Sequence, residues 1–281
     1  MIYVSSRADR YLLEPLMERL DRTDTRYLLV LGDRRETFET AVRYFLDGFP
    51  IIHIQGGEST PFSRDDVYRD CITRMACLHF APTEQAIHRI YQIHPGTVVV
   101  TCGAIGAELA SKMVPIPRAD LPFRTDGKTW LVTWHPQPHE DVEELIEALQ
   151  AHGGDVIWTY PNADPGRENI ISKIREAGYQ PYVELNMSVY LSLMHYVTAV
   201  VGNSSSGLIE APSIGTQTIN IGFRQYGRPQ AKSVASVACR KAEIEAALQL
   251  TDSMPVYAKD NPYYRPGTID TIVREIRKRY A

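Results

Sequence analysis

Short apolar runs alternate with helix-spaced segments along most of the chain, and this alternation restricts the fold more than any other feature. The runs that predict strands are residues 2–4, 27–31, 51–54, 98–101, 129–133, 155–159, 199–201 and 218–221. The segments that predict helices are residues 11–20, 36–46, 67–77, 83–92, 140–151, 168–177, 189–194 and 269–280. Most strand runs are continuously apolar, which is typical of parallel strands buried on both faces. The pattern therefore predicts an α/β fold of βαβ units, with helices covering parallel sheets.

A proline-rich segment at residues 113–123 interrupts this alternation, which then starts again. The prolines of VPIPRADLPF are incompatible with a helical period and mark a linker. A chain of 281 residues is long enough for two domains. We expect a shortened first α/β domain over residues 1–115, a second over residues 123–265, and a C-terminal helix within residues 266–281.

Composition excludes several classes of protein. Hydrophobic residues make up 44% of the chain and charged residues 23%, as in an ordinary globular protein rather than a disordered one. The net charge of −4 provides no general attraction to nucleic acid or to an anionic membrane. The four cysteines form no CxxC pair, and neither a signal peptide nor a membrane-length apolar run is present. We therefore expect a cytoplasmic protein with reduced thiols.

Three consecutive serines follow an expected strand in TAVVGNSSSGLIEA, where a helix is expected to begin. Because hydroxyl groups and the open amides of a helix N-terminus bind phosphate oxygens, Ser204, Ser205 and Ser206 predict a phosphate site. Glu210 would lie about one turn into that helix, within reach of a ribose diol. Arg224, after the next strand, would supply a cation. A serine N-cap that binds no ligand explains the same residues.

Asp33 and Arg34 come directly after the expected strand at residues 27–31. Ligands of parallel sheets bind at the carboxyl ends of the strands, so this pair is well placed for a site. An aspartate N-cap beside a surface arginine is the alternative interpretation.

A Gly-Gly turn follows the expected strand at residues 51–54, in the segment HIQGGEST. Glycines allow the backbone to approach a ligand closely. The carboxylates that follow, Glu58, Asp65 and Asp66, are candidates for acid–base chemistry. The arginines farther along, Arg69 and Arg74, are either anion contacts or solvated helix charges.

Two polar segments follow strands of the second domain. His135 comes after the strand at residues 129–133 in TWHPQPHED, and Asn162 and Asp164 lie in TYPNADPGR. Each is either a site residue or a structural one. The chain contains no GxGxxG, Walker A, HExxH or GxSxG motif, so no motif indicates a kinase, dehydrogenase, zinc protease or α/β-hydrolase.

Taken together, these segments resemble the UDP-N-acetylglucosamine 2-epimerase family, within it the hydrolysing, sialic-acid-pathway branch. The strings that carry the resemblance are SSRADRYLLEPL, LVLGDRRETFETA, HIQGGEST, DDVYRDCITRMACLHFAPTE, LVTWHPQ, YPNADPGR, GNSSSGLIEAPSIGTQTINIGFRQYGR and NPYYRPGTIDTIVREI. They occur in the family's order and span nearly the whole chain. The resemblance implies a GT-B-like fold of two Rossmann-like domains with a UDP-sugar in the cleft between them. It also implies a C-terminal helix that returns towards the first domain, and a homodimer.

The resemblance also implies roles for individual residues. The nucleotide would be held by Arg7, Ser204, Ser205 and Arg224 at the diphosphate, by Glu210 at the ribose, and by Ser206 and Asn162 in the pocket. His135 would be a catalytic residue near the diphosphate and the sugar. Asp33 and Asp65 would be the acid–base carboxylates, with Arg34 beside them. Glu58 is a further catalytic candidate, and Gln55 would contact the substrate. The family reaction removes the C2 proton, expels UDP to leave an unsaturated sugar, and then adds water. The products are N-acetylmannosamine and UDP, and the chemistry requires no metal or other cofactor.

Three departures from the family pattern keep other functions open. The first domain is shorter, Gln55 stands where some members carry a catalytic glutamate, and the family's RADY-x-K segment reads Arg7-Ala8-Asp9-Arg10-Tyr11-Leu12. A glutamine cannot accept a proton as a carboxylate does. One alternative is therefore a glycosyltransferase that uses a UDP-sugar donor on an unknown acceptor. That acceptor could be hydroxymethylated DNA, and a nucleic acid partner is expected only in this case. The other alternative is a non-catalytic UDP-sugar-binding protein.

Overall fold

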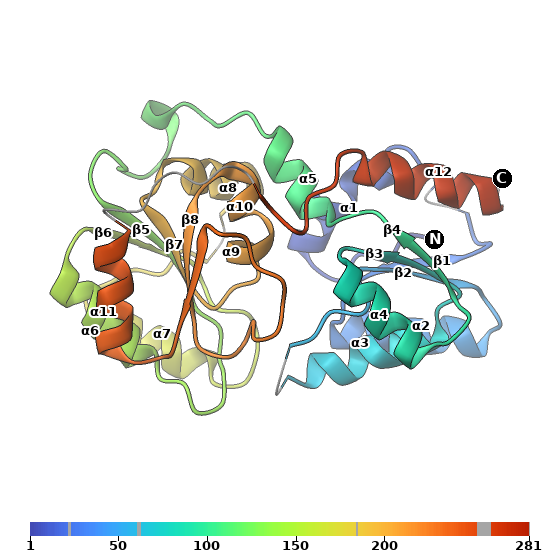
Figure 1. Cartoon of the computed structure of the whole chain (residues 1–281), viewed down its shortest axis with the longest axis horizontal. Helices are drawn as coiled ribbons and strands as arrows, with labels where there is room; N and C mark the ends of the chain where they lie inside the picture. The colour runs from blue at the N-terminus through green and yellow to red at the C-terminus, as the bar shows by residue number, and fades with distance from the viewer. Residues whose placement is uncertain (22–23, 61–62, 184, 252–259, 281) are drawn as a thin grey trace. The chain divides into compact units, whose positions relative to one another are not determined.

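The computed structural model describes residues 1–21, 24–60, 63–183, 185–251 and 260–280. The chain divides into two compact units (Figure 1). Unit 1 comprises Met1–Leu109, Gly227–Pro229 and Pro262–Ala281, and unit 2 comprises Ala110–Tyr226 and Gln230–Asn261. Both units contain a parallel sheet, which confirms the predicted α/β fold. Among the described residues, none of the helices combines the length and the apolar character that crossing a membrane requires.

Unit 1 contains a four-stranded parallel sheet in the order β1-β2-β3-β4. Its strands are β1 (Leu28–Leu31), β2 (Ile51–Ile54), β3 (Leu78–Ala81) and β4 (Val98–Thr101). Its helices are α1 (Arg7–Met17), α2 (Arg35–Leu46), α3 (Arg64–Met75), α4 (Glu84–Ile93), the first residues of α5 (Ile105–Lys112), and α12 (Thr268–Tyr280). The first three strands are buried along their whole length, as their continuous apolar runs require.

Helices cover both faces of the sheet in unit 1 (Figure 1). On one face, α1 and α12 bury an apolar core that includes Leu13, Leu16 and Ile272. On the other face, α2 and α3 pack Ala41 and Ile72 against the strands. The N-terminus of α12 is held by the buried carboxylate of Glu108, which accepts hydrogen bonds from the amides of Gly267 at 3.0 Å and Ile269 at 2.8 Å. The last helix of the chain is thus an integral part of unit 1.

Unit 2 contains a five-stranded parallel sheet in the order β6-β5-β7-β8-β9. Its strands are β5 (Thr129–Thr133), β6 (Asp155–Trp158), β7 (Ala199–Gly202), β8 (Gln217–Ile221) and β9 (Val234–Val237). Its helical segments are η1 (Arg118–Asp120), α6 (Val142–His152), α7 (Arg167–Glu176), α8 (Met187–Tyr196), α9 (Ser206–Ile209), α10 (Ala211–Ile214) and α11 (Lys241–Leu250). The buried tryptophans Trp130, Trp134 and Trp158 form the centre of its core together with α6, α7 and α11.

Several sequence-based predictions of elements were wrong or incomplete. The expected strand at residues 2–4 is a single bridge between Ile2 and Leu29, because only one residue pair meets the parallel ladder there. Strands β3 and β9 and helices α5 and α11 were not predicted. The helix expected after the serines ends after one short turn, and α10 starts separately with Pro212 near its N-terminus. Proline is compatible only with the first turn of a helix, so it forces this break.

Candidate functional site

The polar segments of unit 2 follow neighbouring strands at the carboxyl edge of its sheet. His135 follows β5, the three serines follow β7, and Arg224 follows β8. Because β5, β7 and β8 are adjacent and parallel, their carboxyl ends meet at one edge. Strand β7 ends at Gly202 with φ 132°, where a side-chain Cβ would lie 2.0 Å from the Thr133 carbonyl oxygen. A glycine at this position therefore allows β7 and β5 to approach closely enough for the segments to meet.

Asn203 links three of these segments. Its side-chain Oδ1 accepts the His135 amide at 2.7 Å, and its Nδ2 donates to the His135 carbonyl at 2.9 Å. The backbone carbonyl of Asn203 accepts hydrogen bonds from Arg224 Nη1 at 3.1 Å and from Gln225 Nε2 at 2.9 Å. The Asn203 side chain is fully buried, so these bonds set the positions of His135 and Arg224 relative to the serines.

The serine turn is ordered by hydroxyl contacts. Ser205 stands at the N-cap position of α9, and its carbonyl accepts the Ile209 amide. Ser206 Oγ lies 3.0 Å from Ser204 Oγ and 2.7 Å from the hydroxyl of Tyr190, a residue of α8. Burial raises the pKa of the Tyr190 phenol, so this group stays neutral and can donate. Three hydroxyl groups are thus linked by hydrogen bonds at the turn.

His135 and Asn162 also meet, across β5 and the loop after β6. The Asn162 amide donates to His135 Nδ1 at 3.1 Å, so that ring nitrogen is an acceptor and a neutral His135 carries its proton on Nε2. The side chain of Asn162 donates to Asp164. Its Oδ1 is buried without a hydrogen-bond partner among the described residues, and so remains able to accept one.

Two more residues complete the unit 2 group. Glu210 lies between the two short helices α9 and α10, partly buried, and its charge is close enough to influence the Tyr190 phenol. Glu140 accepts the amide of Phe223, next to Arg224, at 2.6 Å. Burial raises the pKa of Glu140.

Arg69 organises the corresponding part of unit 1. Its side chain is 3% exposed, and it forms ion pairs with Asp33, which follows β1, and with Asp66 in the first turn of α3. It also donates to the Glu58 carbonyl at 2.9 Å and to Thr60 Oγ1 at 3.3 Å. One buried guanidinium therefore orients the turn after β1, the loop after β2 and the start of α3.

Glu58 is engaged in a second buried ion pair. Its Oε2 lies 3.2 Å from Arg228 Nη1, and each side chain is 8% exposed. Arg228 also donates to the Ser59 carbonyl at 2.8 Å and to Thr60 Oγ1 at 2.9 Å. Tyr263 is buried near Glu58, and burial together with that carboxylate raises the pKa of the tyrosine. A cavity of about 260 Å³ borders this pair.

The remaining residues predicted for unit 1 have diverse surroundings. Asp65 lies in the first turn of α3, with its amide bonded to Ser63 Oγ at 3.1 Å. Arg34 precedes α2, is about half exposed, and has its Nε 3.8 Å from Asp9 Oδ2. Gln55 follows β2 with a left-handed φ of 61°. The side chain of Arg7, at the start of α1, lies outside the part that the structure describes.

The predicted site residues divide between the two units. Unit 2 holds His135, Asn162, Ser204, Ser205, Ser206, Glu210 and Arg224, and unit 1 holds Asp33, Arg34, Gln55, Glu58 and Asp65. Sequence reasoning assigned no role to the organising residues Asn203, Arg228 and Tyr263, and it left Arg69 undecided. Their signal was weak but present, because all four lie in the strings that carry the family resemblance.

The protein has two α/β units with parallel sheets and polar groups at the carboxyl edges of those sheets, and this arrangement defines a GT-B-like fold. Similar solved structures have the same fold. The UDP-GlcNAc 2-epimerase from Neisseria meningitidis bound to UDP-GlcNAc has a TM-score of 0.73 at 17% identity and covers 95% of this chain and 80% of its own. The S. aureus MnaA-UDP co-structure has a TM-score of 0.71 at 19% identity, and the match covers 99% of this chain and 83% of that one. At these identities the likeness establishes the fold.

The chain belongs to the UDP-N-acetylglucosamine 2-epimerase family, whose model matches residues 10–277. Polysialic acid biosynthesis protein P7 of Escherichia coli is 32% identical over 89% of this chain and 69% of its own length. The GDP/UDP-N,N'-diacetylbacillosamine 2-epimerase (hydrolyzing) of Campylobacter jejuni is 31% identical over 74% of this chain. The chain spans 59% of the length of that second relative.

Proposed function

We propose that this protein is a hydrolysing UDP-sugar 2-epimerase that converts UDP-N-acetylglucosamine, or a closely related UDP-sugar, into the free 2-epimeric sugar and UDP. The observation that carries the proposal is the Asn203-centred group of unit 2, which joins the serine turn, His135 and Arg224 at the carboxyl edge of a parallel sheet. Family membership and the hydrolysing epimerase among the relatives support it.

In this proposal unit 2 holds the nucleotide. The amides and hydroxyls of the serine turn, together with Arg224, bind the diphosphate, and Glu210 binds the ribose hydroxyls. The Oδ1 of Asn162, which has no hydrogen-bond partner in the described part of the chain, accepts a hydrogen bond from the nucleotide. His135 Nε2, which carries the proton in the neutral ring, donates to a phosphate oxygen. Arg7 adds a further charge at the diphosphate.

The acid–base groups of unit 1 act on the sugar. A carboxylate, Asp33 or Asp65, takes the C2 proton, and the electrons of the C2–H bond form a C1=C2 double bond. The C1–O bond breaks at the same time, and its electron pair leaves on the oxygen of UDP. Water then adds its hydroxyl to C1, and a proton returns to C2 on the opposite face. We assign Asp33 the role of base, because Arg69 holds its carboxylate in place, and Asp65 the role of proton donor. Glu58, already paired with Arg228, holds the loop that carries Gln55.

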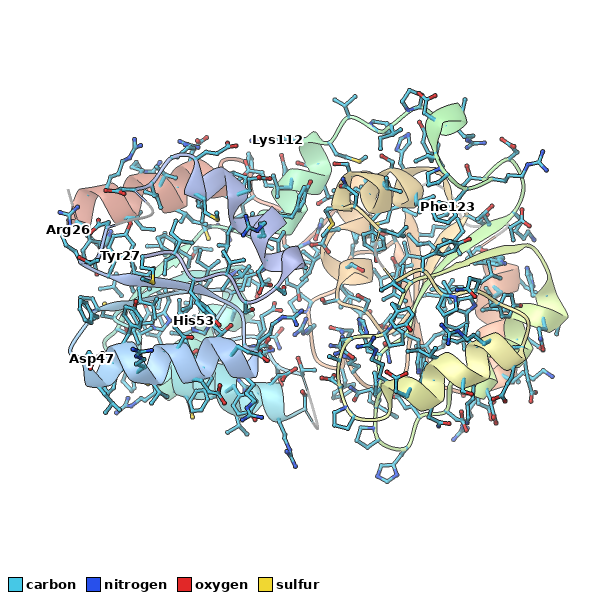
Figure 2. The ribbon with its side chains drawn as sticks, turned by 180° about the vertical axis from the view of Figure 1, so that it is seen from behind. Arg26, Tyr27, Asp47, His53, Lys112 and Phe123 are labelled. Atoms are coloured by element: carbon cyan, nitrogen blue, oxygen red, sulfur yellow. The ribbon has the colours of Figure 1, made fainter. Side chains whose placement is uncertain are left out.

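The direct test is a panel of UDP-sugars incubated with the protein in heavy-oxygen water, with products identified by mass spectrometry. We expect UDP and a free 2-epimeric sugar that contains one heavy oxygen. Asp33→Asn and Asp65→Asn should each lower kcat by about 10²- to 10⁴-fold, the usual range for loss of a general acid or base. Asp47→Asn is the matched control, because this exposed aspartate ends α2, away from β-strand carboxyl ends (Figure 2).

The same experiment separates the alternatives. Consumption of the UDP-sugar without heavy oxygen in a released sugar would identify a glycosyltransferase, and only then would acceptors such as hydroxymethylated DNA be tested. Tight UDP binding without turnover on any donor would identify a non-catalytic UDP-sugar-binding protein. Either result would contradict the epimerase proposal.

We further propose that the protein acts in the cytoplasm as a homodimer. All four cysteines are free thiols, which suits a reducing compartment. Light scattering on a size-exclusion column is expected to give twice the chain mass, and a mass of one chain would contradict the dimer. Fractionation of the source cells would test the location.

A further inference from the structure

His53 lies in the middle of β2 and is fully buried, between two segments that carry candidate catalytic residues. Its Nε2 is 2.8 Å from the carbonyl oxygen of Gly32, the residue before Asp33. Its Nδ1 is 3.2 Å from Oγ1 of Thr73, a buried residue of α3. Figure 2 shows the ring inside unit 1 rather than on its surface. The ring therefore contacts the segment after β1 and the helix whose first turn contains Asp65.

The two contacts determine the protonation state of the ring. A carbonyl oxygen can only accept, so Nε2 carries a proton and donates it to Gly32. Burial lowers the pKa of His53 to about 4, so the ring is neutral at physiological pH and Nδ1 is an acceptor. The hydroxyl of Thr73 then donates to Nδ1. The hydrogen bonds run in one direction, from Thr73 through His53 to the Gly32 carbonyl.

The His53 ring also packs directly against the Gly-Gly turn. A Cβ on Gly56 would lie 2.7 Å from His53 Nδ1 and 3.0 Å from Thr73 Oγ1, so a larger residue has no room there. Gln55, immediately before, has the left-handed φ of 61°. The turn that presents Gln55 is thus packed directly on the ring.

We propose that His53 is a positioning residue that holds the Asp33 turn, the Gln55–Gly57 turn and helix α3 in one fixed arrangement for the chemistry at C2 of the sugar. It touches no substrate and exchanges no proton during turnover. This inference rests on the proposed function for its catalytic consequence, although the arrangement itself can be tested without activity. The groups that face the ring and its surroundings are the buried His79 of β3 and, beyond it, His94.

The test compares His53→Leu, which removes both hydrogen bonds, with His53→Gln, whose amide nitrogen can still donate to Gly32. His79→Leu is the matched control, because His79 is equally buried, is the register partner of His53, and has no hydrogen bond to either turn among the described residues. We expect His53→Leu to lower kcat about 10- to 100-fold, as misplaced catalytic groups do, with KM nearly unchanged. His53→Gln should recover most of that loss, and Thr73→Val should show a smaller loss of the same kind.

Two readouts are independent of turnover. Nitrogen-15 shifts of the His53 ring should show the neutral form protonated at Nε2. Hydrogen exchange should become at least about tenfold faster in peptides covering residues 32–35 and 55–59 of His53→Leu, because local opening becomes easier, but not in His79→Leu. UDP binding, which belongs to unit 2, should be the same in all variants.

A ring protonated at Nδ1, or equal exchange and equal kcat in the two leucine variants, would overturn the inference. If the wild-type protein turns over no UDP-sugar, the proposed epimerase function fails. In that case the ring shifts and the exchange comparison still decide whether His53 positions the two turns.

Discussion

The two candidate groups of residues are built from different chemistry. In unit 1, buried arginines hold carboxylates: Arg69 pairs with Asp33, and Arg228 pairs with Glu58. In unit 2, the central residue is the neutral amide of Asn203, and it bonds to backbone groups of His135. The ion pairs orient the carboxylates of unit 1, whereas the neutral group of unit 2 leaves the anionic charge to be supplied by a ligand.

This difference predicts which changes will destabilise each unit. Removing one member of a buried ion pair leaves an uncompensated charge, which costs more than the loss of a neutral hydrogen bond. Unit 1 should therefore respond strongly, in its stability, to charge changes and to acid. Substitutions in the neutral group of unit 2 should lower the stability less, and should change the affinity for the nucleotide more.

The largest effect is expected from Arg228→Met. It leaves Glu58 buried without its cation and should lower the free energy of unfolding by about 3–5 kcal/mol, measured by urea denaturation. Glu58→Gln combined with Arg228→Met should cost much less than the sum of the two single variants, because no unpaired charge remains. Arg26→Met is the control, since Arg26 is exposed and its partner Asp24 lies two residues away. If the double variant instead loses as much stability as the two single variants together, Glu58 and Arg228 are not energetically coupled.

Acid should destabilise the protein through its buried histidines. Burial lowers the pKa of His53 to about 4 and that of His79 to about 3, both below the ordinary value of 6.5. The unfolded chain therefore binds more protons as pH falls below about 6.5, and stability is lost from there down to the folded-state values. We expect a loss of about 4 kcal/mol between pH 7 and pH 5, roughly 2 kcal/mol from each histidine.

The measurement is the urea midpoint as a function of pH. The slope between pH 7 and pH 5 should become shallower in His53→Gln and in His79→Leu, because each removes one buried titrating group. A slope unchanged in both variants would assign the acid sensitivity to other groups, such as the paired carboxylates.

Asn203→Ala tests the neutral group of unit 2. It removes both side-chain hydrogen bonds to the partly buried backbone amide and carbonyl of His135. We expect a loss of about 2 kcal/mol in stability, together with weaker UDP binding in calorimetry. The matched variant is Asn261→Ala, which removes a buried asparagine of the same unit that bonds to the Ile209 carbonyl at 2.7 Å. If both variants weaken UDP binding equally, the loss of affinity comes from removing any buried asparagine of unit 2 rather than from the contacts of Asn203 with His135.

The smallest effect is expected at Gln55. A left-handed φ costs a non-glycine residue roughly 1 kcal/mol or more, and glycine adopts it freely. Gln55→Gly should raise the free energy of unfolding by less than about 1 kcal/mol, because the extra freedom of glycine in the unfolded chain offsets part of the gain. Gln55→Ala is the control, since it keeps the strain, and equal stability of the two variants would contradict the explanation.

The sequence predicted the strand ends well because continuous apolar runs mark buried parallel strands. It therefore located the segments after β1, β2, β5, β7 and β8. It missed β3, whose four residues lie close between two helical segments, and it missed β9, which is only half-buried. The expected strand at residues 2–4 failed because an apolar run does not reveal whether a neighbouring strand extends far enough to pair with it.

The partners of the site residues could not be predicted in the same way. Arg228 bonds to Ser59 across 169 positions, and Asn203 bonds to His135 across 68. Neither spacing has a local period, so these pairs appear only when the sheets have formed. A sequence pattern can show that a residue follows a strand, but the contact depends on tertiary packing.

The central claim is that the serine turn and Arg224 of unit 2 hold the diphosphate of a UDP-sugar. The most direct measurement is a crystal structure of the protein with UDP. We predict the two phosphates at the amides and hydroxyls of Ser204–Ser206, with the Arg224 guanidinium bonded to them. UDP bound elsewhere, or a serine turn filled by the protein's own side chains, would contradict the claim.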